Sequence, residues 1–126
     1  MNIVSQLAAV LAGLIHVLIF VMESVLFRRP VIHRRFGAEA EHLDAVRPWA
    51  FNQGWYNLFL AAGALGGVIA AHVGNGEAGR SIALFSCACM LGAAVVLIAS
   101  DRAMARPALV QGLAPLAALL AWSVSM

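Results

Sequence analysis

The chain has 126 residues, of which 63% are hydrophobic and 11% charged, and its formal net charge is +2. Soluble domains average about 25% charged residues, so this composition excludes an ordinary soluble protein and indicates a single integral membrane domain over residues 1–126. All eight basic residues are arginine, and most of them stand between apolar stretches. This distribution predicts a membrane topology signal and excludes a nucleic-acid-binding surface.

Four apolar stretches each come close to the roughly 20 residues that a helix needs to cross a bilayer core. They cover residues 3–27, 49–73, 80–100 and 107–125. We therefore predict an all-α fold: a four-transmembrane-helix bundle with a partly helical, Arg-rich interfacial loop between the first two helices. Within that loop we expect Pro30 to open a short turn, Gly37 to end it, and residues 38–46 to form an interfacial helix that stops before Pro48.

The arginines fall almost entirely into the first and third connections between these stretches. Seven of the eight lie there, namely Arg28, Arg29, Arg34, Arg35, Arg47, Arg102 and Arg106. Because cytoplasmic loops carry an excess of arginine, we predict a multi-pass protein of the inner cell membrane with loops 1 and 3 in the cytoplasm and both termini outside. Membrane lipids are then its constant partners, and the loop arginines suit anionic headgroups.

The first stretch carries two titratable residues, His16 and Glu23. A separation of seven residues places them on one face of a helix, about 10.5 Å apart along its axis. An acid at mid-membrane costs about 2.5–3.5 kcal/mol on insertion scales, so such groups usually face a protein interior, a cavity or a partner. Glu23 also lies only five residues from Arg28, near enough for it to reach the arginine-rich interface.

The second and fourth stretches add further polar groups. Four hydrogen-bonding side chains share one stripe of the second stretch on a helical wheel: Asn52, Gln53, Tyr56 and Asn57. Gly63 and Gly67 continue that face as a Gly-x-x-x-Gly pattern, which admits another helix closely. In the fourth stretch Pro115 leaves the carbonyl of Gln111 without its helical donor. We predict that these polar groups line one cytoplasm-facing pocket together with His16 and Glu23.

Such a pocket predicts that the protein binds or transforms a small lipophilic molecule by proton transfer. The candidate catalytic residues are His16, Glu23 and Tyr56, and the candidate ligand-binding residues are Asn52, Gln53, Asn57 and Gln111. Proton transfer suits histidine, whose ordinary pKa lies near neutral pH. The reaction classes that fit are isomerisation, dehydration and hydrolysis. We predict no cofactor and no metal, since no second His or Cys is expected at the depth of His16.

Two alternatives remain open at this point. The first is a proton-coupled transporter of the small multidrug type, which has a similar length, four spans and a Glu in the first span. That family lacks the Asn52-Gln53-Gly54-x-Tyr56-Asn57 block. The second alternative is a structural or assembly protein in which the polar residues only fix helix packing, within one chain or between copies in a homo-oligomer.

The motifs of three stretches also resemble a known family of small bacterial integral membrane proteins, the domain of unknown function 1304. The resemblance rests on His16 and Glu23, on Asn52-Gln53-Gly54-x-Tyr56-Asn57 followed by Phe59-Leu60-Ala61-x-Gly63, and on Gln111-Gly112-x-x-Pro115. It covers nearly the whole chain. The third stretch departs from the pattern, because it ends Ala99-Ser100-Asp101-Arg102 where a small turn with Gly and an aromatic residue is expected. The resemblance implies the fold and the polar residues as a set, and it supplies no reaction.

Overall fold

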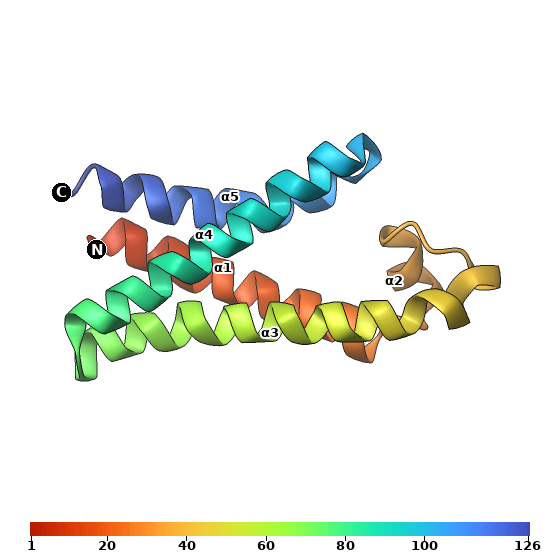
Figure 1. The fold of residues 1–126 in the computed structure, drawn as a ribbon, viewed down its shortest axis with the longest axis horizontal. Helices are drawn as coiled ribbons and strands as arrows, with labels where there is room; N and C mark the ends of the chain where they lie inside the picture. The colour runs from red at the N-terminus through yellow and green to blue at the C-terminus, as the bar shows by residue number, and fades with distance from the viewer.

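The computed structural model describes residues 1–126, and the chain is helical almost throughout (Figure 1). Helix α1, Ile3–Phe20, continues into a π-helical turn at Val21–Val25, named the π turn below. The other helices are α2, Pro30–Arg35, α3, Leu43–Val73, α4, Gly76–Ser100, and α5, Ala105–Ser123. Two 3-10 turns, Ala40–His42 and Arg102–Met104, lead into α3 and α5. The chain has no strand, so the predicted all-α fold is confirmed.

Four helical segments are long and apolar enough to cross a membrane. They are Ile3–Val25, Ala40–Val73, Gly76–Ser100 and Arg102–Ser123. These segments match the four predicted stretches in number and order. The predicted four-helix architecture is therefore confirmed, and it is consistent with a multi-pass membrane protein.

The four long helices form a ring in the order α1, α3, α4, α5. Helix α1 packs against α3 and α5, α4 packs against the same two helices, and α1 and α4 scarcely touch. The α1–α3 and α4–α5 connections lie at one end of the bundle, whereas the termini and the α3–α4 turn lie at the other (Figure 1). Seven of the eight arginines lie in or beside the first pair of connections. That end is named the arginine-rich end below.

The core consists largely of small side chains, which let membrane helices approach closely. Its buried members are Ala8, Ala9, Ala12, Ala64, Cys87, Met90, Ala114 and Ala118. Helices α3 and α4 approach closely at Gly67, because a Cβ on this residue would lie 2.6 Å from the backbone nitrogen of Ala83 and would also meet the backbone of Gly79. Gly63, one turn earlier, faces the side chain of Ser86. The predicted role of Gly63 and Gly67 in close helix approach is confirmed.

Helix α3 begins earlier than the sequence pattern predicts. The separate interfacial helix predicted over residues 38–46 is wrong, because α3 runs without a break from Leu43 through Pro48. Near a helix start, a proline removes only one backbone hydrogen bond. Here the helix continues past the proline into the long apolar stretch that follows. Earlier in the loop, Pro30 is the first residue of α2, and Gly37 has a φ of +72°, in the left-handed region that favours glycine.

Candidate functional site

Three pairs of residues fix how α1 lies against α3. They are Gln6 with His72, Gly13 with Leu65, and Glu23 with Asn57. The helices are antiparallel: as the residue number rises along α1, the number of the partner residue on α3 falls by a similar amount. This register places His16 level with residues 61–63 of α3. It also places the polar block that begins at Asn52 beside the π turn and the arginine-rich end.

Glu23 and Asn57 are brought together by this register. The Nδ2 group of Asn57 donates to Oε2 of Glu23 at 3.1 Å, and the two side chains are only 7% and 8% exposed. The same Nδ2 group donates to the carbonyl of Gln53, one turn earlier, at 3.1 Å. The Glu23 carboxyl therefore turns into the helix interface and meets a neutral amide, rather than reaching out to the loop arginines.

Glu23 occupies the centre of the π turn, which the sequence analysis did not predict. In this turn the N–H of Leu26 donates to the carbonyl of Val21, five residues earlier, at 2.9 Å. Turns of this kind usually interrupt α-helices singly and are frequent at functional sites. No composition pattern marks the turn in the sequence.

Gly54 lets α3 approach the π turn closely. A Cβ at Gly54 would overlap the hydroxyl of Ser24 and lie 3.1 Å from the Cβ of Glu23. The Ser24 hydroxyl also donates to the carbonyl of Phe51 at 2.8 Å. Sequence reasoning missed both Ser24 and the role of Gly54. The one available signal was a glycine inside a polar block of a helix, where glycine lowers helix propensity.

His16 is the deepest of the predicted site residues and is 1% exposed. Its Nδ1 atom lies 2.9 Å from the carbonyl of Ala12. Because a carbonyl only accepts, Nδ1 carries the hydrogen, and Nε2 is left as an acceptor when the ring is neutral. No hydrogen bond joins His16 to Glu23. The two residues therefore stand at two depths of one helix and do not form a direct acid-base pair.

Asn52, Gln53 and Tyr56 lie on an uncovered side of α3. All three are exposed, Tyr56 to 59%. At 100° per residue, Asn52 and Tyr56 fall within about 60° of Gly63 and Gly67, the glycines that contact α4. Figure 1 shows α4 moving away from α3 toward the arginine-rich end. The face of α3 that packs against α4 at Gly63 and Gly67 is therefore uncovered at Asn52 and Tyr56. This uncovered part faces the angle between α3 and α4.

Gln111 lies on the inward face of α5, in line with the buried residues Ala108, Pro115 and Ala118. Its side chain is half-buried and makes no hydrogen bond. Pro115 stands within α5, so the carbonyl of Gln111 lacks its helical donor, in agreement with the sequence. Helix α5 packs against α1 and α4 rather than against α3. Gln111 therefore approaches the site from another wall, and the seven predicted residues do not close into one compact pocket.

The family of the chain is shown by its match to a family model over residues 10–123. The model describes a protein of unknown function, DUF1304. The chain belongs to this family. No curated protein and no solved structure matches it significantly. The matched region of this DUF1304 protein includes every predicted site residue, from His16 to Gln111.

The side chains of this DUF1304 protein offer two kinds of chemistry at the site. The carboxyl of Glu23 and the imidazole of His16 can exchange protons. The amides of Asn52 and Gln53 and the phenol of Tyr56 can orient a polar group by hydrogen bonds. No group of three or more His, Cys, Asp or Glu residues is gathered to hold a metal ion.

Proposed function

We propose that this DUF1304 protein binds a small lipophilic molecule in the angle between α3 and α4 and transfers a proton to or from it. The observation that carries the proposal is the environment of Glu23, a buried carboxyl whose partner is the neutral amide of Asn57. Acids within membrane spans are costly and usually pair with other charged groups or serve proton relays. A carboxyl that meets only an amide is suited to gaining and losing a proton.

The exposed polar side chains supply a place for the ligand's polar group. Asn52, Gln53 and Tyr56 use no side-chain hydrogen bonds within the chain, and acyl chains offer none. A hydroxyl or carbonyl group that enters the angle between α3 and α4 would satisfy them. His16, level with the point where α4 leaves α3, is the second proton-exchanging group, and Gln111 contacts the ligand from α5.

The proposed setting is the inner cell membrane. The gathering of seven arginines at one end of the bundle supports a topology with loops 1 and 3 in the cytoplasm and both termini outside. Asn52, Gln53 and Tyr56 then lie in the cytoplasmic half of the membrane. In that position they are reached by lipophilic molecules that diffuse within the inner leaflet.

The same buried carboxyl favours a second candidate, proton-coupled export of a lipophilic molecule. Export requires a group that binds a proton and a substrate in turn, and Glu23 meets that requirement. The two candidates differ in outcome. An enzyme changes the chemical identity of the molecule, whereas an exporter changes only its location.

The test uses cells whose chromosomal copy of the gene is deleted and then replaced by defined variants. Glu23→Gln and His16→Ala remove the two proton-exchanging groups. Their matched controls are Glu77→Gln and His42→Ala, which change exposed residues of the same types. Untargeted lipid and metabolite profiles are measured in cells and medium, and immunoblots of membranes confirm equal amounts of each variant.

We expect the wild type and both control variants to restore one set of metabolites that Glu23→Gln and His16→Ala fail to restore. A substrate and product that exchange levels in the cells support the enzyme. One unchanged compound that moves between cells and medium, and follows the protonmotive force, supports the exporter. If all four variants restore the same profile as the wild type, the polar residues serve packing only and the proposal is wrong.

A further inference from the structure

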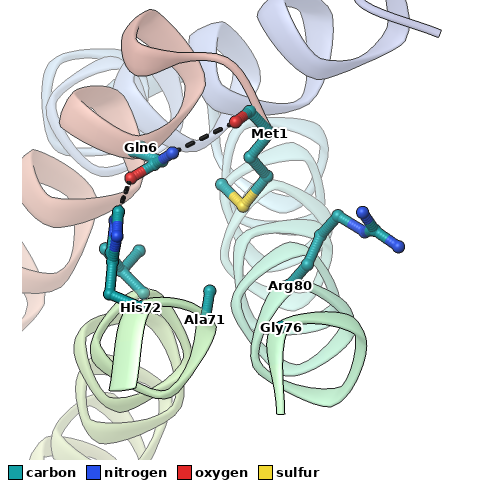
Figure 2. A pocket seen from close by; sticks show the side chains of 7 residues that line it. Met1, Gln6, Ala71, His72, Gly76 and Arg80 are labelled. Atoms are coloured by element: carbon teal, nitrogen blue, oxygen red, sulfur yellow. Dashed lines mark hydrogen bonds between the residues drawn. The ribbon is translucent and has the colours of Figure 1, made fainter. Parts of the chain in front are cut away.

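A polar pocket lies at the end of the bundle opposite the arginine-rich end. It has a volume of about 210 Å³ and is lined by the start of α1, the last turns of α3 and the first turns of α4. Figure 2 shows Gln6 and His72 on one side of the Met1 side chain and Arg80 on the other, with Gly76 at the start of α4. None of these residues belongs to the site proposed above.

Two hydrogen-bond acceptors of the pocket wall, the carbonyl of Met1 and the amide oxygen of Gln6, already have donors. The amide nitrogen of Gln6 donates to the carbonyl of Met1 at 3.1 Å, which turns the amide oxygen of Gln6 toward His72. Nε2 of His72 lies 2.6 Å from that oxygen and donates to it. Nδ1 of His72 has no hydrogen-bond partner; it is an acceptor in the neutral ring and a donor in the charged ring. The Gln6–His72 bond thus fixes one wall (Figure 2).

The polar groups of the pocket wall that have no hydrogen-bond partner are mainly donors. Arg80 is the one arginine outside the arginine-rich end, and its guanidinium group is exposed, with five N–H groups to offer. The N–H of Gly76, the first residue of α4, also has no partner, because the side chain of Asn75 accepts only from Glu77 and Ala78. No carboxylate lines the pocket. A cavity with an unpaired guanidinium group and an unpaired backbone N–H group is complementary to an anion.

We propose that this pocket binds a phosphate group, with Arg80 as its cation and Gly76 as a backbone donor. Arginine matches phosphate geometry through paired N–H donors, and the start of a 25-residue helix adds a favourable dipole. The phosphate belongs either to a phospholipid headgroup at the membrane surface or to a free anion. The pocket is independent of the angle between α3 and α4, so either proposal stands without the other.

The experiment measures binding to the purified full-length chain in detergent by native mass spectrometry. The probes are short-chain phosphatidylglycerol, the diacylglycerol with the same chains, and inorganic phosphate as a competitor. Arg80→Gln removes the cation, and Arg102→Gln is the control at the other end of the bundle. Gly76→Pro removes only the backbone donor. Proline suits the first position of a helix, and the preceding Asn75 has a φ of -84° and a ψ of 101°, which a following proline tolerates.

We expect phosphatidylglycerol to bind at least tenfold more weakly to Arg80→Gln and several-fold more weakly to Gly76→Pro, with Arg102→Gln close to the wild type. Displacement of the lipid by an equal or lower concentration of inorganic phosphate identifies a free-anion site, and displacement only by a large molar excess identifies a headgroup site. Three results would overturn the proposal. They are diacylglycerol binding as tight as that of phosphatidylglycerol, an equal loss of lipid affinity in Arg80→Gln and Arg102→Gln, and no binding of either phosphate probe.

Discussion

Asn57 donates to Glu23 across the α1–α3 interface at 3.1 Å, level with the π turn. Both side chains are buried, and the bond joins an ionisable group to a neutral one. The pair thus has two separable roles. It joins α3 to α1, and in the proposed function its carboxyl is the group that exchanges a proton.

Because the hydrogen bond from Asn57 to Glu23 joins α3 to α1, we expect a loss of stability when Asn57 is replaced. Asn57→Leu leaves the buried Glu23 carboxyl without its donor, so the free energy of unfolding should fall by about 1–3 kcal/mol. Asn52→Leu, in the same polar block but exposed and without a hydrogen bond, should change it by less than about 0.5 kcal/mol. Equilibrium unfolding in mixed micelles measures both. Equal effects of the two variants would show that the Asn57–Glu23 bond contributes no stability.

Close packing at the π turn predicts that Gly54 does not tolerate a side chain. Gly54→Ala drives a methyl group into the Ser24 hydroxyl and the Cβ of Glu23, and should cost about 1–3 kcal/mol of unfolding free energy. Gly66→Ala is the control on the same helix, because nothing lies within 4 Å of its added Cβ. That change should be neutral or stabilise the helix by up to about 1 kcal/mol. A Gly54→Ala protein as stable as Gly66→Ala would contradict the close approach.

Much of the architecture could be predicted from the sequence, because membrane length and hydropathy dictate it. The four helices follow from the apolar stretches, and the close α3–α4 approach follows from Gly63 and Gly67. Part of the site was predictable as well. The sequence predicts Glu23 and Asn57 as separate candidate residues, because polar groups in membrane helices need partners, and the structure joins them by a hydrogen bond that the sequence does not predict.

The π turn and the exposure of Tyr56 depend on contacts between helices, which no local sequence pattern predicts. Ser24 of the π turn contacts Phe51 and Gly54 of α3, and no local pattern of α1 predicts these contacts between two helices. The exposure of Tyr56 depends on how steeply α4 leaves α3 beyond the contact between Gly63 and Ser86. A helical wheel places residues on a common face, and it cannot say how far along that face a neighbouring helix extends.

The contact between Gly67 and α4 predicts that an alanine at Gly67 destabilises the bundle. A Cβ at Gly67 meets backbone atoms of Gly79 and Ala83, which cannot rotate away as a side chain can. Gly67→Ala should therefore separate α3 from α4 and cost about 3 kcal/mol, the upper end of ordinary overpacking. The control on α4 is Gly92→Ala, where an added Cβ has open space. If both variants unfold at the same denaturant concentration, the α3–α4 contact is looser than described.

The proposed topology predicts which ends of the bundle a water-soluble maleimide reaches. In sealed right-side-out membrane vesicles, Ser125→Cys should be labelled at once, whereas Glu39→Cys should be labelled only after the vesicles are opened. The wild type is the control, because Cys87 is buried and Cys89 half-buried within α4. Labelling of Glu39→Cys in sealed vesicles would reverse the orientation.

The proposed site predicts that function and stability separate at the exposed part of α3. Tyr56 makes no hydrogen bond and is 59% exposed, so Tyr56→Phe should change the free energy of unfolding by less than about 0.5 kcal/mol. It should nevertheless fail to restore the metabolite profile of the deletion strain, because the ligand loses a hydrogen-bond partner. Full restoration by Tyr56→Phe would remove Tyr56 from the site.

A crystal structure grown from a lipid mesophase tests the central proposal most directly. We expect elongated non-protein density in the angle between α3 and α4, with a polar end within hydrogen-bond distance of Tyr56 or Glu23. Glu23→Gln crystals should show that density weakened or absent. A structure in which α4 lies closed over Asn52 and Tyr56, with every polar side chain paired within the protein and no ligand density, would contradict it.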